Sequence, residues 1–396
     1  MKKLQNLSLL IMGLLLLLSS ELYSQYNPPQ NERTLNALQN QTIVSPEIHS
    51  DNKVTFRIFA PKSETVVLIG DWKSDGESRV NLNKNTTGVW SITIGPLKPE
   101  LYGYAFNVDG VTVIDPSNTL IKRNTKKNSS LLLISGNESD LYAVKEVPHG
   151  TISKVWYSSP SLKLTRRMYV YTPPGYENDT KKKYPVLYLL HGSGGDEDAW
   201  TQQGRAPNIL DNLIALGKAK SMIVVMTNGN ATEAAENGFA PEVPGQQVKT
   251  NDSPRVYIAG PFEESLVKDV VPFIESHYRV FNDKNNRAIA GLSMGGAQTQ
   301  KIALDNPDMF GYIGVFSAGQ RLSGDLENRY KELKSKKPTL YWVGMGLDDK
   351  RYNLVLPLIE LLKKNKFSYV FRESTGGHTW ANWRIYLSEM TPLIFK

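Results

Sequence analysis

Short stretches of alternating apolar and polar residues mark the first part of the chain. Val54, Phe56 and Ile58 alternate with polar neighbours, and Asp109-Gly110 is typical of a tight turn. A period of two is typical of strands with one buried face, and short strands separated by turns are typical of a β-sandwich of about 100 residues. We predict strands over 54–58, 66–69, 89–94, 102–108 and 111–114, followed by edge hairpins and a linker over 122–150.

The pattern changes after Gly150, where continuous apolar runs alternate with segments of helical spacing. In the segment 264–277, apolar residues recur at 266, 267, 270, 271 and 274, as in an amphipathic helix. Apolar strands that alternate with helices indicate a parallel sheet covered on both faces. The predicted strands are 168–172, 186–190 and 222–226, and the predicted helices are 206–217 and 264–277.

The first residues differ from both patterns. Lys2 and Lys3 precede an apolar run, Leu9 to Leu18, and small and polar residues follow. This order is typical of a signal peptide, and the run is shorter than the about 20 residues that a membrane-spanning helix needs. We predict a secreted or periplasmic protein without a stable membrane span after signal removal; an uncleaved anchor is the alternative. The predicted division is a signal peptide at 1–24, a β-sandwich at 25–145 and an α/β domain at 146–396.

Composition narrows the chemistry. The 396 residues contain no Cys and five His, and the formal net charge is +7. The lack of cysteine excludes thiol nucleophiles, zinc–thiolate sites and iron–sulfur clusters. The lysines are scattered and do not interleave with aromatic residues, which argues against nucleic-acid binding. We predict no cofactor and no metal.

The strongest chemical signal is the segment 291–295, Gly-Leu-Ser-Met-Gly, a G-x-S-x-G motif. Strand-like residues 287–290 precede it, and helix-forming residues 296–304 follow it. A strand, a tight turn and a helix in this order present a nucleophilic serine, and the flanking glycines leave room for the turn. Ser293 is therefore the predicted nucleophile, and an ordinary serine in a tight turn is the alternative.

A nucleophilic serine needs an acid and a base, which follow it in that order in α/β-hydrolases. His378 is the one histidine downstream of Ser293, so it is the predicted base. The acid is expected after the predicted strand 339–345, where Asp348 and Asp349 follow. Spacing alone does not choose between these two carboxylates.

Two backbone N–H groups are expected to bind the oxyanion of the reaction. Met294, the residue after the nucleophile, supplies the first. The glycine-rich loop 191–195 follows a predicted strand and supplies the second, from Ser193 or Gly194. His191, which opens this loop, is assigned a structural role.

Three tryptophans are candidates for binding the acyl group. Trp380 and Trp383 follow His378 at helical spacing, and Trp200 follows the glycine-rich loop. Packing in the core is the alternative for Trp380 and Trp383, since a tryptophan in a helix near a chain end often belongs to the core.

Five segments beyond residue 147 carry a family resemblance: 148–150, 167–176, 190–195, 291–296 and 377–380. Together they resemble the esterase D-like group, which includes the family 1 carbohydrate esterases, that is, feruloyl and acetylxylan esterases. The resemblance implies an α/β-hydrolase fold and a Ser-His-Asp mechanism. In this family the acid stands fourth in a Gly-x-x-Asp after the strand, which implies Asp349. An aromatic residue next to the His lines the acyl pocket, which implies Trp380.

The segments 54–61, 67–72 and 115–117 are similar to the isoamylase N-terminal, family 48 carbohydrate-binding module. This resemblance implies an immunoglobulin-like all-β sandwich before the catalytic domain. The segment has no obvious cluster of tryptophans that could stack on sugar rings. Two roles therefore stay open: the sandwich binds glycan, or it only shapes the rim of the active site.

The leading prediction is a feruloyl esterase that removes ferulate from plant cell-wall polysaccharide such as arabinoxylan. An acetylxylan esterase, a siderophore-lactone esterase and a non-catalytic glycan-binding protein are the alternatives. The complete Ser, Asp and His set argues against the last of these.

Overall fold

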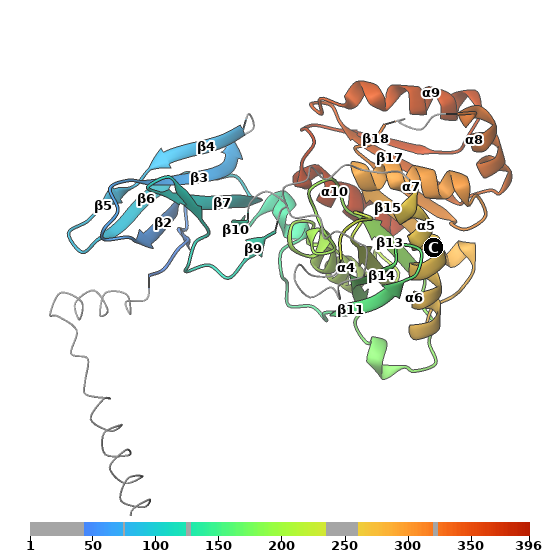
Figure 1. Ribbon diagram of the computed structural model, residues 1–396, viewed down its shortest axis with the longest axis horizontal. Helices are drawn as coiled ribbons and strands as arrows, with labels where there is room; N and C mark the ends of the chain where they lie inside the picture. Colours follow the sequence, from blue (N-terminus) through green and yellow to red (C-terminus); the bar gives the residue numbers. More distant parts are fainter. Residues whose placement is uncertain (1–42, 74–75, 124–127, 235–259, 320–323) are drawn as a thin grey trace, which may run out of the picture.

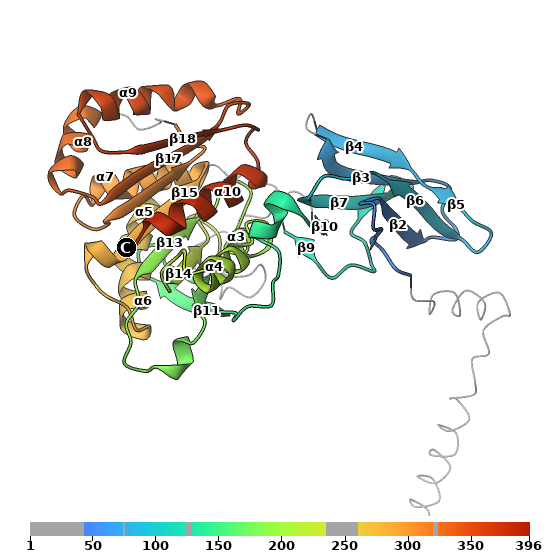
Figure 2. The ribbon, with the colours of Figure 1, turned by 180° about the vertical axis from the view of Figure 1, so that it is seen from behind.

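The computed structural model describes residues 43–73, 76–123, 128–234, 260–319 and 324–396. A β-sandwich is followed by an α/β domain, and the two units lie side by side (Figures 1 and 2). The predicted signal peptide at 1–24 lies outside the described residues. Within the described ranges, no helix is long and apolar enough to span a membrane.

Two antiparallel sheets form the sandwich. Their strands are β1 (Glu47–Ile48), β2 (Val54–Phe59), β3 (Val66–Lys73), β4 (Gly76–Asn81), β5 (Asn83–Lys84), β6 (Val89–Ile94), β7 (Glu100–Val108), β8 (Val111–Val113), β9 (Ile121–Lys122) and β10 (Ser129–Ile134). One sheet has the order β1-β2-β6-β5; the other has the order β4-β3-β7-β10-β9, with β8 paired to β7. The alternating positions Val54, Phe56 and Ile58 all lie in the core between the sheets, which confirms the all-β prediction for this region.

The expectation of edge hairpins and a linker over 122–150 was wrong for β10. This strand lies between β7 and β9, and five of its six residues are buried. Its apolar run starts only at Leu131, after two serines that are themselves buried. Ser130 accepts a hydrogen bond from the Asp115 N–H at 2.9 Å. These serines made the start of a core strand look like a surface loop.

The α/β domain is built on one eight-stranded sheet with the order β11-β12-β14-β13-β15-β16-β17-β18. Its strands are β11 (Thr151–Ser159), β12 (Leu164–Thr172), β13 (Val186–Leu190), β14 (Ile223–Thr227), β15 (Arg287–Leu292), β16 (Tyr312–Phe316), β17 (Leu340–Gly346) and β18 (Val370–Ser374). The six strands from β14 to β18 are parallel, as predicted. The edge strand β11 pairs antiparallel with β12, and β12 pairs antiparallel with β14, which the prediction of a parallel sheet missed.

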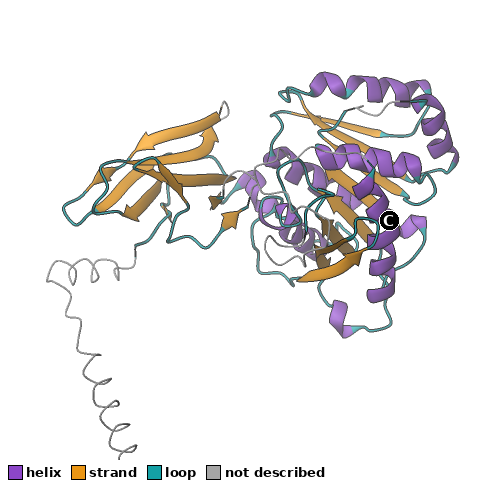
Figure 3. Ribbon diagram, in the orientation of Figure 1, coloured by secondary structure: helices purple, strands orange, loops and turns teal. Residues whose placement is uncertain are grey.

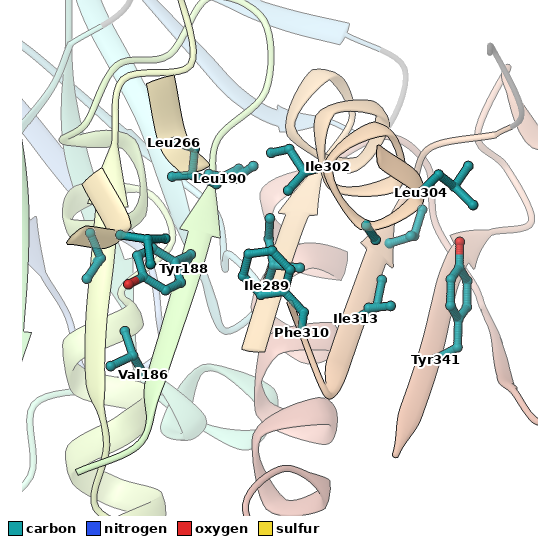
Figure 4. Close-up of a cluster of buried hydrophobic side chains, with 14 of the residues drawn as sticks. Val186, Tyr188, Leu190, Leu266, Ile289, Ile302, Leu304, Phe310, Ile313 and Tyr341 are labelled. Atoms are coloured by element: carbon teal, nitrogen blue, oxygen red, sulfur yellow. The ribbon is translucent and has the colours of Figure 1, made fainter. Parts of the chain in front are cut away.

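Helices cover both faces of this sheet, as Figure 3 shows. Residues of α3 (Ala199–Gln202), α4 (Ala206–Ala215) and α10 (Trp380–Met390) belong to the core on one face. The opposite core takes residues of α5 (Pro261–Ser265), α6 (Val271–His277), α7 (Met294–Asp305), α8 (Leu326–Ser335) and α9 (Leu356–Lys364). In that core, Tyr188, Ile289 and Ile313 of adjacent strands pack beneath Ile302 of α7 (Figure 4). This packing fixes α7, and with it the serine at its start.

Candidate active site

Ser293 occupies a sharp turn between β15 and α7. Its backbone has φ 53° and ψ −110°, outside the regions that most residues adopt. A Cβ on Gly295 would lie 2.6 Å from the carbonyl oxygens of Leu190 and His191, and a Cβ on Gly291 would lie 2.5 Å from the Gly295 carbonyl. Both flanking positions therefore require glycine, and the turn holds the serine at the carboxyl end of the sheet.

Three side chains from separate loops form a hydrogen-bonded line at this turn. His378 lies between β18 and α10, and Asp349 follows β17. The Nε2 atom of His378 is 2.9 Å from Ser293 Oγ, and its Nδ1 atom is 2.6 Å from Asp349 Oδ2. When Nδ1 carries the proton and donates to the carboxylate, Nε2 is free to accept the serine proton.

The structure brings Asp349, and not Asp348, to the histidine. Asp349 is only 4% exposed, and its second oxygen accepts the Arg351 N–H at 2.9 Å. Asp348 is exposed, and its carboxylate accepts the Gly376 N–H at 2.9 Å. The two adjacent residues thus have different partners. Asp349 contacts the histidine, and Asp348 holds the backbone at Gly376, two residues before it.

The segments predicted to bind the oxyanion both lie at Ser293. Met294 is the first residue of α7, where a backbone N–H has no partner within the helix. In the glycine-rich loop, a Cβ on Gly192 would lie 3.2 Å from Ser293 Cβ, so the loop runs directly beside Ser293. Gly194 has φ +85°, which lets the chain turn at the predicted donor pair Ser193 and Gly194.

His191 supports this loop from below. Its side chain is 1% exposed, and Nε2 accepts the Gly229 N–H at 2.8 Å. Because a backbone N–H can only donate, Nδ1 carries the proton and donates to the Gly192 carbonyl at 2.7 Å. Burial lowers the pKa of His191 below its ordinary value, so the ring stays neutral and holds the loop.

The three predicted tryptophans form one cluster next to the histidine. Trp383 is 6% exposed, stands edge-on to the His378 ring at 5.0 Å and donates from Nε1 to Ser317 Oγ at 2.9 Å. Trp200 is 1% exposed and donates to the Leu190 carbonyl. Trp380 is partly exposed and meets Trp200 and Trp383 edge-on at 5.2 and 5.1 Å. Trp380 is therefore the one of the three with a surface for a ligand, and the two others hold it in place.

Two supporting residues of this site were missed in the sequence. Ser317, which holds Trp383, and Gly229, which holds His191, each follow closely after a strand, β16 and β14. A position at the carboxyl end of a parallel strand was the one signal available, because site residues of α/β sheets gather there.

A serine turn between strand and helix, with a Ser–His–Asp line above a mostly parallel sheet, defines an α/β-hydrolase domain. The chain belongs to the "Putative esterase" family, whose model matches residues 159–394. Residues 44–120 match carbohydrate-binding module 48, the isoamylase N-terminal domain. Both family resemblances of the sequence are thereby confirmed.

Individual relatives agree with this family. The endo-1,4-β-xylanase/feruloyl esterase of Xylanibacter ruminicola is 34% identical over 358 residues, which cover 89% of this chain. The chain spans 46% of the length of that relative. A ferulic acid esterase from the fungus Anaeromyces mucronatus is 26% identical, with a TM-score of 0.55, over 65% of this chain and 95% of its own.

The enterobactin esterase of Shigella flexneri matches over 90% of this chain and 97% of its own, with a TM-score of 0.59. At 16% identity, this likeness concerns the fold alone. It extends over nearly the whole chain, so the order of a sandwich and a hydrolase domain is shared.

Proposed function

We propose that this protein is a serine esterase that releases ferulate from plant cell-wall polysaccharide such as arabinoxylan. The observation that carries the proposal is the Ser293–His378–Asp349 line, with distances of 2.9 and 2.6 Å. The proposed substrate is supported by the likeness to a xylanase/feruloyl esterase that is 34% identical over 89% of the chain.

In the proposed reaction, His378 Nε2 takes the proton of Ser293 as the oxygen attacks the ester carbonyl. The N–H groups of Met294 and of Ser193 or Gly194 stabilise the tetrahedral oxyanion. The protonated histidine then gives its proton to the departing sugar hydroxyl, which leaves an acyl-serine. A water molecule, deprotonated by the same ring, attacks this ester and releases ferulate and the free serine.

Trp380 is the proposed contact for the aromatic acyl group. It is partly exposed, and its chain position two residues after His378 keeps it near the reacting carbonyl. A flat ferulate ring gains offset stacking on such a surface, about 0.5–1.5 kcal/mol beyond burial. An acetyl group is too small to use it.

We further propose that the protein acts outside the cytoplasm, in the periplasm or after secretion. The support is the charged start and short apolar run of residues 1–24. Polymeric cell-wall substrate is found outside the cell, so export and substrate agree. Mass spectrometry of the N-terminus after expression in a bacterial host tests the cleavage.

A panel of purified-protein assays tests the substrate. Methyl ferulate, acetylated xylan and a siderophore trilactone are compared by specificity constant, with Ser293→Ala as the blank. We expect methyl ferulate to lead by at least about tenfold, a difference of about 1.4 kcal/mol in transition-state binding. A lead of acetylated xylan would overturn the ferulate assignment in favour of deacetylation.

A further inference from the structure

The sandwich contacts the α/β domain beside two of the catalytic loops. The start of β7 meets α10, the helix that begins two residues after His378, through Glu100 and Arg384. Leu133, near the carboxyl end of β10, packs against the core cluster to which α10 contributes. The residue after β9 meets the segment that follows the glycine-rich loop. Figure 1 shows the ends of β7, β9 and β10 facing the α/β domain.

The first contact is a partly buried ion pair between Glu100 of β7, whose side chain is 26% exposed, and Arg384 of α10. The Arg384 side chain is 2% exposed and also donates to the Gln203 carbonyl at 2.6 Å. The Tyr142 hydroxyl donates to the same Glu100 oxygen at 2.5 Å, and its ring lies 4.5 Å from the guanidinium. A residue of the sandwich is thus the counter-ion of a charge inside the catalytic domain.

Apolar residues reinforce this ion pair. Leu101, next to Glu100, and Leu133 of β10 pack against the core cluster that contains Trp200 and Trp383. Trp383 is adjacent to Arg384 in α10 and touches the His378 ring. A shift of the first turns of α10 would therefore move Trp383, and with it the His378 ring that Trp383 contacts.

The second contact joins Arg123 to two carboxylates of the other loop. Its guanidinium lies 3.1 Å from Asp196 and 3.5 Å from Asp198. Asp196 directly follows the loop 191–195 that holds the proposed oxyanion donors. Arg123 is 42% exposed, and exposed ion pairs contribute little, so the Glu100 contact is expected to dominate.

We propose that the sandwich is part of the catalytic unit, with Glu100 as a positioning residue for His378. Glu100 neutralises Arg384 and so holds the first turns of α10 in place. These turns carry Trp383, which packs against the His378 ring. This inference rests on the proposed role of the Ser–His–Asp line. It assigns the sandwich a part in the hydrolysis of any ester, independent of whether it binds glycan.

Truncation of Glu100 would remove the carboxylate partner of the Arg384 guanidinium, which is 2% exposed, and an uncompensated buried charge is costly. Part of that cost is relieved if α10 moves and the guanidinium reaches water. A misplacement of about 1 Å at a catalytic group costs on the order of 10²-fold in rate. The expected signature is a lower kcat for small esters with little change in KM.

The test compares Glu100→Ala, Glu100→Asp and the matched control Glu47→Ala in the full chain. Glu47 pairs with Arg57 at 2.6 Å on the other sheet of the sandwich. The readouts are kcat and KM for 4-nitrophenyl acetate, the rate at which a fluorophosphonate labels Ser293, and thermal melting. All rates are measured at a temperature where melting shows each variant fully folded.

We expect Glu100→Ala to lower kcat and the labelling rate by about 10- to 100-fold, with KM within about threefold. Glu100→Asp should recover part of the loss, and Glu47→Ala should stay within about twofold. A folded Glu100→Ala protein with wild-type kcat and labelling rate would overturn the proposal, whatever its melting temperature.

If Glu100→Ala does not fold, the isosteric Glu100→Gln carries the test. It keeps the shape and a hydrogen-bond acceptor but removes the charge, so we expect kcat to fall by about three- to tenfold; an unchanged kcat refutes the positioning role. A wild-type protein that is labelled and hydrolyses 4-nitrophenyl acetate but leaves methyl ferulate intact would instead refute the proposed substrate alone.

Discussion

Replacing Asp349 by Asn tests the geometry of the site most directly, because the change removes one charge and keeps the shape. In the native site, Oδ2 accepts from His378 Nδ1 at 2.6 Å and Oδ1 accepts the Arg351 N–H at 2.9 Å. An asparagine has a single oxygen for these two donors. Because the Arg351 N–H cannot turn away without moving the backbone, it keeps that oxygen, and the amide NH₂ faces the histidine.

The expected magnitude follows from this arrangement. Facing an NH₂ group, Nδ1 must act as the acceptor, so the neutral ring carries its proton on Nε2. That nitrogen then has no lone pair for the Ser293 proton at 2.9 Å. A wrong tautomer of this kind costs about 10⁴ in kcat in a serine protease, and we expect 10³- to 10⁴-fold here, about 4–5.5 kcal/mol at 1.36 kcal/mol per decade.

Steady-state hydrolysis of methyl ferulate is the assay, and Asp348→Asn is the matched control. Asp348 is exposed, and its carboxylate accepts the Gly376 N–H at 2.9 Å, a contact that an amide oxygen can keep. We expect this variant to lose no more than about threefold. The reverse ranking, with both variants folded by circular dichroism, would show that Asp348 is the acid and that the arrangement described above is not the reactive one.

Three further expectations follow from the site. Ser293→Ala should lower ester hydrolysis by about 10⁴- to 10⁶-fold without loss of the fold, and substantial activity in a folded variant would refute the nucleophile. Trp380→Ala should shift the ratio of ferulate to acetate specificity constants by about tenfold toward acetate; an unchanged ratio with a lower melting temperature would mean that the ring only packs on Trp200. Burial lowers the pKa of His191 from 6.5, so below pH 6.5 the unfolded chain takes up a proton that the folded chain does not, and stability falls as the pH falls. Urea unfolding at pH 7 and pH 5 should show a smaller loss in His191→Gln than in the wild type, and an equal loss would contradict this.

Local patterns in the chain were enough for the fold class and for two of the three residues in the Ser–His–Asp line. Period-two alternation of apolar residues predicted the core strands of the sandwich, and continuous apolar runs predicted strands that are buried on both faces. Ser293 was found because strand, turn and helix are all local features. His378 followed by counting, since only one histidine stands downstream.

Local patterns could not distinguish between neighbouring residues of the same type, and they could not identify contacts between residues far apart in the chain. Asp348 and Asp349 share one local environment in sequence, and family resemblance alone favoured the second. The fold decides between them because consecutive residues of the turn point to different partners, Gly376 and His378. The buried serines of β10 were also missed, because their burial depends on neighbours from elsewhere. The antiparallel edge strand β11 (Thr151–Ser159) was missed because only two of its nine residues are buried, so it carries no clear apolar pattern.

What the sequence by itself determined is the order of elements and the candidate nucleophile and base, Ser293 and His378. What only the tertiary structure decided is which distant groups share a site. Glu100 and Arg384 lie 284 positions apart, and each alone has the pattern of a solvated charge. A period of two or of 3.6 records which face of an element is buried, but it carries no information on the partner that buries it.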